Sequence, residues 1–286
     1  MPELPEVETI ARGLDAQASG QRIVKARLIT PKVLLRGKPE MLEGRSIRRV
    51  VRRAKLLMAM LDNEDALIFH LKMTGRVWLA AARQPLPKHT HLVLELESGD
   101  RVIFEDQRRF GYFGLFSPAE LETWDFHVSL GPEPLSISPE ELAARLKGRR
   151  SAIKSLLLNQ TVVAGVGNIY ADESLFAARI HPASTASAIP EKRLLLLCAE
   201  LQRILLAAIE AGGSTFSDYR NAYGKSGIFQ EFFQVYGKKG EPCPACRRPL
   251  VAATVAGRTS THCSRCQRRL VLGSHRDIGP AHREQR

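Results

Sequence analysis

Four cysteines near the C-terminus have the spacing of a metal site. Cys243 and Cys246 are separated by two residues, as are Cys263 and Cys266, and sixteen residues lie between the two pairs. Two residues between cysteines let both sulfur atoms reach one ion from a single tight turn, and two such turns complete a tetrahedral shell around Zn²⁺. Two disulfides or an iron–sulfur site are the alternatives. The tight clustering favours one zinc ion, which is structural because protein sulfurs fill all four positions.

The segment around these cysteines is strongly basic. The chain has a formal net charge of +12 and a pI near 9.8. Eleven Lys or Arg but only three Asp or Glu lie in residues 238–286, so about two thirds of the positive excess lies in the last sixth of the chain. A local excess of this kind favours a polyanionic partner. A solvated basic surface without a partner is the alternative.

Composition places the chain among globular proteins. Hydrophobic residues make up 44% and charged residues 25% of 286 residues, enough for two domains with their own cores. No apolar stretch is long enough to span a bilayer, and the acidic start MPELPEVET lacks the features of a signal peptide. We therefore expect a cytoplasmic protein without a membrane partner. No segment has the pattern of an oligomerisation helix, so we expect a monomer.

Several separated motifs resemble the formamidopyrimidine-DNA glycosylase family, bacterial enzymes that excise 8-oxoguanine and ring-opened purines. In the family's order they are MPELPEVET, RRAKLL (52–57), HLKMTG (70–75), EDQRRFGYF (105–113), NQTVVAGVGNIYADE (159–173), GGSTFSDY with GKSGIFQ (212–230), and the four-cysteine segment. The resemblance covers nearly the whole chain. It implies a base-excision-repair glycosylase with AP lyase activity that acts on double-stranded DNA containing oxidised bases. Leu4 stands where the related endonuclease VIII group usually has glycine, which favours the purine-directed branch.

The resemblance assigns the nucleophile to Pro2, which becomes N-terminal when Met1 is removed. An α-amino group has a pKa near 8, so a useful fraction of it is neutral at cytosolic pH. Its attack on C1′ of the sugar leaves an iminium ion. Because Pro2 is a secondary amine, this ion has no N–H proton to lose and stays electrophilic, so β- then δ-elimination follow. Glu3 is then the general acid that protonates the sugar ring oxygen, and Glu6 an orienting carboxylate. Without the resemblance, Pro2 begins a loose terminus and both glutamates are ordinary acids of a first helical turn.

The same resemblance assigns roles at the damaged nucleotide to further residues. Lys55 contacts the lesion and its phosphate from a strand, and Arg258 joins the catalytic group. An enzyme reaches a base only after taking it out of the stack. Residues of two loops then fill the gap and contact the DNA around it, namely Met73, Arg108, Arg109 and Phe110. The alternatives are a solvent-reaching strand lysine at Lys55 and a hairpin core at Met73 and Phe110.

Backbone phosphates are assigned to a second group of residues. Lys154 lies on the first helix of a helix–two-turn–helix unit, and Asn168 caps the second helix, which begins at Ile169. His70 and Arg258 add phosphate contacts. The alternative is an ordinary helical hairpin with glycines in its turn. The loop 212–230 resembles one that closes over the flipped base, and candidates for contact there are Ser217, Tyr219, Arg220 and Tyr223.

Three positions depart from the residues frequent in the family. They are Leu56, Lys72 and Asn159, where many relatives have Tyr, Gly and Asp. None of them is a proposed nucleophile, acid or cysteine. We expect small effects on DNA contact from these departures.

The elements that must position these residues give an α+β fold. Residues 1–128 alternate like the strands of a β-sandwich after one helix, which begins near Pro5 and lines one face with Val7, Ile10 and Leu14. Residues 91–97 and 101–104 predict a hairpin. We expect a catalytic sandwich domain at 1–128, a linker at 129–142 that ends in a helix start at Ser138, a helical domain at 143–240, a β-hairpin zinc finger at 241–269 and a basic tail at 270–286.

Two other functions remain open from the sequence. One is the same scaffold directed at oxidised pyrimidines, as in the endonuclease VIII group. The other is a protein that binds damaged or bent DNA without cutting it, which requires that Met1 is retained or that Pro2 lies far from the DNA.

Overall fold

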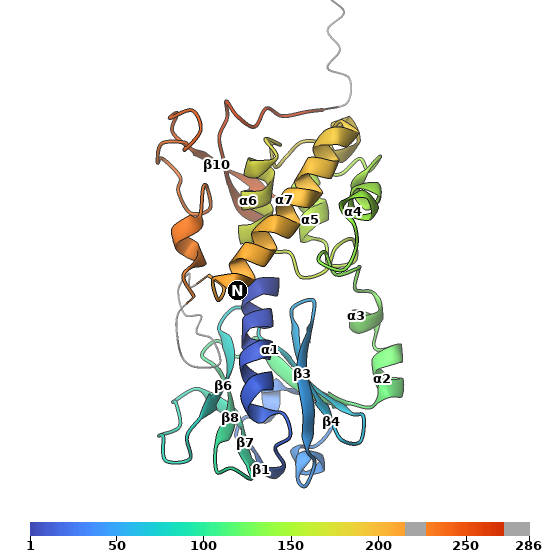
Figure 1. Cartoon of the computed structure of the whole chain (residues 1–286), viewed down its shortest axis with the longest axis vertical. Helices are drawn as coiled ribbons and strands as arrows, with labels where there is room; N and C mark the ends of the chain where they lie inside the picture. The colour runs from blue at the N-terminus through green and yellow to red at the C-terminus, as the bar shows by residue number, and fades with distance from the viewer. Residues whose placement is uncertain (215–226, 272–286) are drawn as a thin grey trace, which may run out of the picture.

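The helix at the start of the chain runs along the strand-rich half of the molecule, and its N-terminal end reaches the helical half (Figure 1). The computed structural model describes residues 1–214 and 227–271. α1 (Leu4–Ala18) begins after Glu3, whose backbone N–H donates to Glu6 Oε2 at 2.9 Å. Val7, Ile10 and Leu14 point into the core of the sandwich, as their spacing predicted. Leu4, in contrast, belongs to the core of the helical half.

Two sheets, whose strands pair mostly in antiparallel fashion, form the sandwich. The five-stranded sheet has the order β2 (Leu34–Arg36), β9 (Tyr112–Phe116), β5 (Ala66–His70), β4 (Leu56–Leu61) and β3 (Ile47–Arg53), and β2 is parallel to β9. The four-stranded sheet has the order β1 (Ile23–Leu28), β7 (Thr90–Leu96), β8 (Arg101–Asp106) and β6 (Gly75–Ala80). The predicted hairpin is confirmed by the β7–β8 pairing. Rings of Phe69, Phe104 and Phe113 meet between the sheets at centroid distances of 5.6–6.1 Å.

Two short helices that the sequence analysis did not predict cover the outer face of the five-stranded sheet. They are α2 (Pro118–Thr123) and α3 (Asp125–Val128). The ring of Trp124, which lies between them, stacks on the ring of Phe116 with the two centroids 4.5 Å apart. The signal for α2 is present in the sequence, because Ser117 and Glu120 form a capping box of the same kind as Ser138 does with Glu141.

The helical half contains α4 (Pro139–Leu146), α5 (Ile153–Leu158), α6 (Asn168–Ala177) and α7 (Glu191–Glu210). α7 is the long apolar run, and it packs against α4, α6 and the start of the chain. Single 3-10 turns occur at Pro31–Val33, Pro39–Leu42, Ala186–Ala188 and Phe229–Phe232. No helix of residues 1–214 or 227–271 combines the length and apolarity that crossing a bilayer requires.

The predicted finger hairpin is formed by β10 (Val251–Val255) and β11 (Arg258–His262), which pair in antiparallel register. Gly257 occupies the turn with φ +68, a conformation that favours glycine. β11 lies against α6. The fold is thus a β-sandwich with a flanking helix, joined to a helical domain that carries a cysteine-bearing β-hairpin.

Candidate active site

The start of the chain lies at the junction of the two halves (Figure 1). The backbone N–H of Leu4 donates to the carbonyl of Gly165, in the loop before α6, at 3.1 Å. Pro2 is buried in the chain that still carries Met1, whereas Met1 itself is 47% exposed. Because Met1 is bonded to the Pro2 nitrogen, its loss frees that nitrogen on the side from which Met1 now projects.

Glu3 is a buried carboxyl at this junction. Only 3% of the residue is exposed, and its Oε1 accepts a hydrogen bond from the Ile169 backbone N–H at 3.0 Å. Its Oε2 has no hydrogen-bond partner within the residues that the structure describes. Burial raises the pKa of Glu3 to about 7, against the opposing positive charge of Lys55. At neutral pH this side chain can therefore hold a proton and donate it.

A glycine makes room for that carboxyl. A Cβ at Gly167 would lie 2.3 Å from the Glu3 carboxyl carbon, so no side chain fits there without displacing Glu3. Gly165 has φ +83 and packs against Leu4 in the same way. The two glycines of the turn before α6 thus serve the N-terminal residues as well as the turn.

Four hydrogen bonds hold Glu6 within the part of the chain that the structure describes. It accepts from the Glu3 N–H, from the Tyr170 hydroxyl at 2.6 Å, and from the N–H and hydroxyl of Ser214 at 2.8 and 2.9 Å. A carboxylate with this many donors is fixed in place. Glu6 therefore has the geometry of an orienting group for the backbone at Glu3.

Lys55 lies in the turn between β3 and β4 and not on a strand, which corrects the expectation from the sequence. The turn consists of Ala54 and Lys55, and Ala54 has φ +55, which β-strand continuation does not allow. Lys55 is 8% exposed. Burial lowers its pKa, Glu3 and Glu6 raise it, and Arg258 and Lys72 lower it further. Lys55 is thus near enough to Glu3, Glu6 and Arg258 for their charges to act on it.

His70 ends β5 next to this group. Burial, aided by the charges of Lys72 and Lys55, lowers the pKa of His70 to about 3, so its ring is neutral at physiological pH. Its Nδ1 accepts from the backbone N–H of Lys72 at 3.1 Å. Lys72 has φ +50, a backbone conformation that favours glycine.

Met73, Arg108 and Phe110 form an exposed cluster, and Arg109 beside them is exposed as well. Met73 is 48% and Phe110 52% exposed, which rules out the alternative that they are hairpin core. Arg108 Nη1 lies 3.3 Å from the Met73 sulfur, and its guanidinium carbon lies 4.7 Å from the Phe110 ring centroid. Residues of two separate loops thus project together.

A buried carboxylate beneath this cluster was missed by the sequence analysis. Asp106 is fully buried, although its position in a charged turn suggested exposure. It accepts hydrogen bonds from the Thr74 hydroxyl, from the Arg108 N–H at 3.1 Å and from the Gly111 N–H at 2.7 Å. Asp106 therefore fixes the two loops relative to each other.

The expected cap at Asn168 is wrong. Gly167 is the N-cap of α6, and Asn168 is the first helical residue without a capping side-chain bond. Its amide donates instead to the carbonyl of Thr259 on the finger hairpin at 3.0 Å. The carboxyl that accepts from the start of α6 belongs to Glu3.

Lys154 also differs from the expectation of a phosphate contact. Its side chain is fully buried, and Nζ contacts Asp172 at 2.6 Å, Ser260 Oγ at 2.6 Å and the Thr259 carbonyl at 3.3 Å. An ammonium with these partners is not free to bind a phosphate. Lys154 instead joins α5, α6 and β11, so that it positions the finger against the helices.

The four finger cysteines are suited to a single zinc ion. Their sulfur atoms all lie within 4.8 Å of one another, with Cys246 to Cys263 at 3.4 Å and Cys243 to Cys266 at 4.0 Å. Tetrahedral Zn–S bonds place sulfur atoms roughly 3.8 Å apart. A disulfide requires about 2 Å, and all four cysteines are free. The cluster therefore can hold one ion, in keeping with structural zinc.

The remaining expected residues Ser217, Tyr219, Arg220 and Tyr223 lie outside the described residues. Arg258 is exposed at the start of β11 and makes no salt bridge with any residue that the structure describes. Its guanidinium is thus free to bind an anion.

Two family models match this chain. The formamidopyrimidine-DNA glycosylase N-terminal domain matches residues 1–113, and the H2TH domain of the same enzymes matches residues 130–220. This chain belongs to the formamidopyrimidine-DNA glycosylase family. The family explains the order of the elements, with a sandwich first and a helix–two-turn–helix second.

Similar proteins extend the match to nearly the full length. The formamidopyrimidine-DNA glycosylase of Cereibacter sphaeroides is 44% identical over 94% of this chain and 100% of its own. A point mutant of the Lactococcus lactis glycosylase, in complex with DNA containing Fapy-dG, is 36% identical with a TM-score of 0.88, covering 94% of this chain and 100% of that one. The wild-type Lactococcus lactis enzyme, in complex with DNA containing an oxidized pyrimidine, is 36% identical over the same shares with a TM-score of 0.85.

Proposed function

We propose that this chain is a DNA glycosylase with AP lyase activity, which removes oxidised purines such as 8-oxoguanine and formamidopyrimidines from double-stranded DNA. The observation that carries the proposal is Glu3. Its carboxyl is protonated up to about pH 7, one of its oxygens is unpaired, and it directly follows the residue whose nitrogen is freed by loss of Met1. Catalysis by a general acid requires a proton at the operating pH and a free direction in which to donate it.

The proposed reaction begins at the Pro2 nitrogen. Its lone pair forms a bond to C1′ of the damaged nucleotide, and the base leaves with the electrons of the glycosidic bond. The ammonium proton is lost, the C1′–O4′ bond breaks, and O4′ takes the proton of Glu3 while the nitrogen lone pair forms the iminium. Removal of a proton from C2′ then expels the 3′ phosphate, and a second elimination expels the 5′ phosphate.

Lys55 and Arg258 supply positive charge beside this centre. The electrostatic coupling of Lys55 to Glu3 and Arg258 supports roles for both cations at the lesion's phosphates. Because Nδ1 of His70 accepts from the Lys72 N–H, its neutral ring carries the proton on Nε2, which can donate a hydrogen bond there. In this proposal, the exposed cluster of Met73, Arg108 and Phe110 fills the gap left by the extruded nucleotide, with Arg109 on the flanking DNA.

Asn168 and the cysteines support the DNA surface. The N-terminus of α6 and the Asn168 amide face the finger hairpin, where Arg258 is free for phosphate. Zinc bound by Cys243, Cys246, Cys263 and Cys266 would supply rigidity to the hairpin and no chemistry. We keep the domain division at 128, 142, 240 and 269 and monomeric action as parts of this proposal.

Borohydride trapping tests the mechanism. A duplex oligonucleotide with 8-oxoguanine opposite cytosine is incubated with the protein and reduced, so that the iminium becomes a stable covalent adduct. We expect an adduct with the wild type and none with a form extended before Met1, in which Pro2 has no free amine. A purified native protein that retains Met1 and yields no adduct would favour binding without cleavage.

Lesion preference needs a second duplex. The Lactococcus lactis enzyme has been seen with an oxidized pyrimidine as well as with Fapy-dG, so oxidised pyrimidines are the second candidate substrate. We expect single-turnover excision of 8-oxoguanine to be faster than that of thymine glycol. The reverse order would assign the chain to the pyrimidine-directed function.

A further inference from the structure

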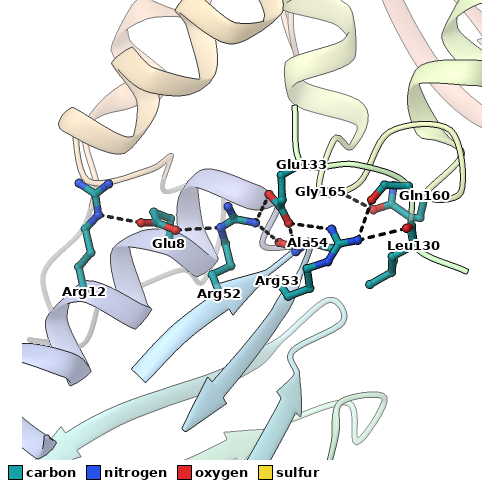
Figure 2. Close-up of polar contacts among 10 residues, drawn as sticks. Glu8, Arg12, Arg52, Arg53, Ala54, Leu130, Glu133, Gln160 and Gly165 are labelled. Carbon is teal, nitrogen blue, oxygen red and sulfur yellow. Dashed lines mark hydrogen bonds and ion pairs between the residues drawn. The ribbon is translucent and has the colours of Figure 1, made fainter. Parts of the chain in front are cut away.

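A carboxylate on the linker between the two halves holds the turn that carries Lys55. Figure 2 shows Glu133 between two arginines of β3. Its Oε2 accepts from Arg52 Nη1 at 2.7 Å, and its Oε1 accepts from Arg53 Nη1 at 3.1 Å and from the Ala54 backbone N–H at 2.5 Å. Ala54 is the residue with φ +55 that directly precedes Lys55. One side chain thus holds three consecutive residues, the last two of β3 and the first of the turn.

The same linker is bound to the loop before α6 (Figure 2). Arg53 Nη2 donates to the carbonyl of Gly131 at 2.8 Å, and the Gly131 N–H donates to the carbonyl of Gln160 at 2.8 Å. The Gln160 side chain accepts from the Gly165 N–H at 2.9 Å. The Gly165 carbonyl accepts in turn from the Leu4 N–H. Hydrogen bonds therefore run without interruption from the β3–β4 turn to the residue after Glu3.

The network is sheltered from water, so its geometry is well defined. The side chain of Glu133 is 15% exposed and that of Arg52 is 8% exposed. Ion pairs of this kind lose much less strength to solvent than surface pairs do. Gly131 approaches the backbone of Thr161 so closely that a Cβ would lie 2.8 Å from the Thr161 carbonyl oxygen. The linker cannot shift there without disturbing the loop.

We propose that Glu133 is a positioning residue that sets Lys55, contributed by the sandwich, against Glu3, which the helical half holds. The proposal rests on the proposed function, because it gives Glu133 its role through two residues of that reaction. Glu133 touches neither of them. It acts through the backbone of the turn, and its carboxylate is the only acceptor in the described structure shared by Arg52, Arg53 and Ala54.

Glu133→Gln tests the proposal. The amide keeps the size of the side chain, but its nitrogen faces the donors of the turn and its charge is lost. Glu8→Gln is the matched control, because Glu8 pairs with the same Arg52, at Nε and 2.9 Å, but touches neither Arg53 nor Ala54. Glu133→Asp keeps the charge and draws the carboxylate back by one methylene. All four proteins are first compared by circular dichroism and thermal unfolding.

Two readouts separate positioning from support of the fold. They are the reaction with DNA and the pKa of Glu3 in the free protein. Single-turnover excision at saturating enzyme measures the chemical step, and DNA affinity is measured separately. We expect Glu133→Gln to slow the chemical step by roughly 10–100-fold with affinity within about threefold, and Glu8→Gln to change neither by more than about twofold. Glu133→Asp should fall between the wild type and Glu133→Gln.

The second readout needs no substrate. Carboxyl ¹³C NMR, with the Glu3 signal assigned by its loss in Glu3→Gln, gives the pKa of Glu3. Displacement of the Lys55 cation removes an influence that lowers this pKa, so it should rise in Glu133→Gln and stay unchanged in Glu8→Gln.

The outcomes are distinct. An unchanged chemical step or an unchanged pKa of Glu3 in folded Glu133→Gln overturns the proposal, as does a loss of rate that merely follows loss of thermal stability. If the wild type excises no lesion while the pKa of Glu3 still rises in Glu133→Gln, the proposed function fails and the coupling between Glu133 and the Lys55–Glu3 pair stands.

Discussion

The surroundings of Glu3 and the Met73–Arg108–Phe110 cluster differ in burial and in how firmly their side chains are held. Glu3 and Glu6 are almost completely buried, and backbone and hydroxyl groups of the helical half donate to their carboxyls. Met73 and Phe110 are about half exposed, and they contact chiefly Arg108. Hydrogen bonds hold the carboxyls of the first region, except at Glu3 Oε2, while Asp106 holds the second region through the backbone of its loops.

The difference follows from what each region has to meet. A group that transfers a proton must be held in one place and desolvated, because that shifts its pKa and aligns the transfer. Side chains that replace an extruded base must be free to enter the stack, so only their backbone can be rigid. A buried carboxyl group serves each region, as the proposed acid in one and as an anchor in the other.

Glu3→Gln should give the largest effect. The amide preserves the shape of the buried centre but has no proton to give, so we expect base excision to slow by about 10³-fold. DNA affinity should stay near that of the wild type. Single-turnover excision together with a binding titration checks this, and a loss of affinity equal to the loss of rate would contradict the assignment of Glu3 as the acid.

Loss of the metal tests whether DNA binding depends on the support that the zinc finger gives. Cys246→Ser should release zinc and weaken DNA binding by about 10²-fold, because the hairpin that carries Arg258 and contacts Asn168 loses its brace. Zinc is measured by mass spectrometry and affinity by titration. Cys198→Ala, which changes a buried cysteine of α7 outside the cluster, should retain both.

Asp106→Asn loosens the exposed region alone. The amide nitrogen must face either the Gly111 N–H or the donors of Thr74 and Arg108, so the two loops lose their common register. Excision from duplex DNA should slow by about tenfold. Excision from single-stranded DNA, which needs no gap filled, should change little; an equal loss on both substrates would mean that Asp106 supports the sandwich as a whole.

The pH profile gives a smaller effect. Glu3 must be protonated, so its active fraction falls as pH rises through about 7, by roughly fivefold between pH 7 and 8. The Pro2 amine must be neutral, so its active fraction rises with pH. Excision by the wild type should therefore be bell-shaped, with apparent pKa values that belong to the pair. The residual rate of Glu3→Gln should instead rise to a plateau, and a bell in that variant would assign the second ionisation elsewhere.

Sequence motifs predicted the layers and the metal cluster because those depend on local patterns. Alternation gave β7 and β8, cap residues gave α4, and cysteine spacing gave the finger. The roles of Lys154 and Asn168 depended on contacts with β11, about a hundred residues away, and no local pattern encodes them. Glu133 and Asp106 were overlooked for the same reason. Each is a lone acid whose meaning comes from the donors that surround it after folding.

The first helix has a consequence for motion. Its first residue, Leu4, is embedded in one domain while its later turns are embedded in the other. If the two domains rotate relative to each other to admit a duplex, a segment packed into both must lie near the rotation axis and move least. The nitrogen of Pro2 sits two residues from Leu4. Opening and closing would therefore move the outer loops, which we propose to contact DNA, much further than the proposed nucleophile.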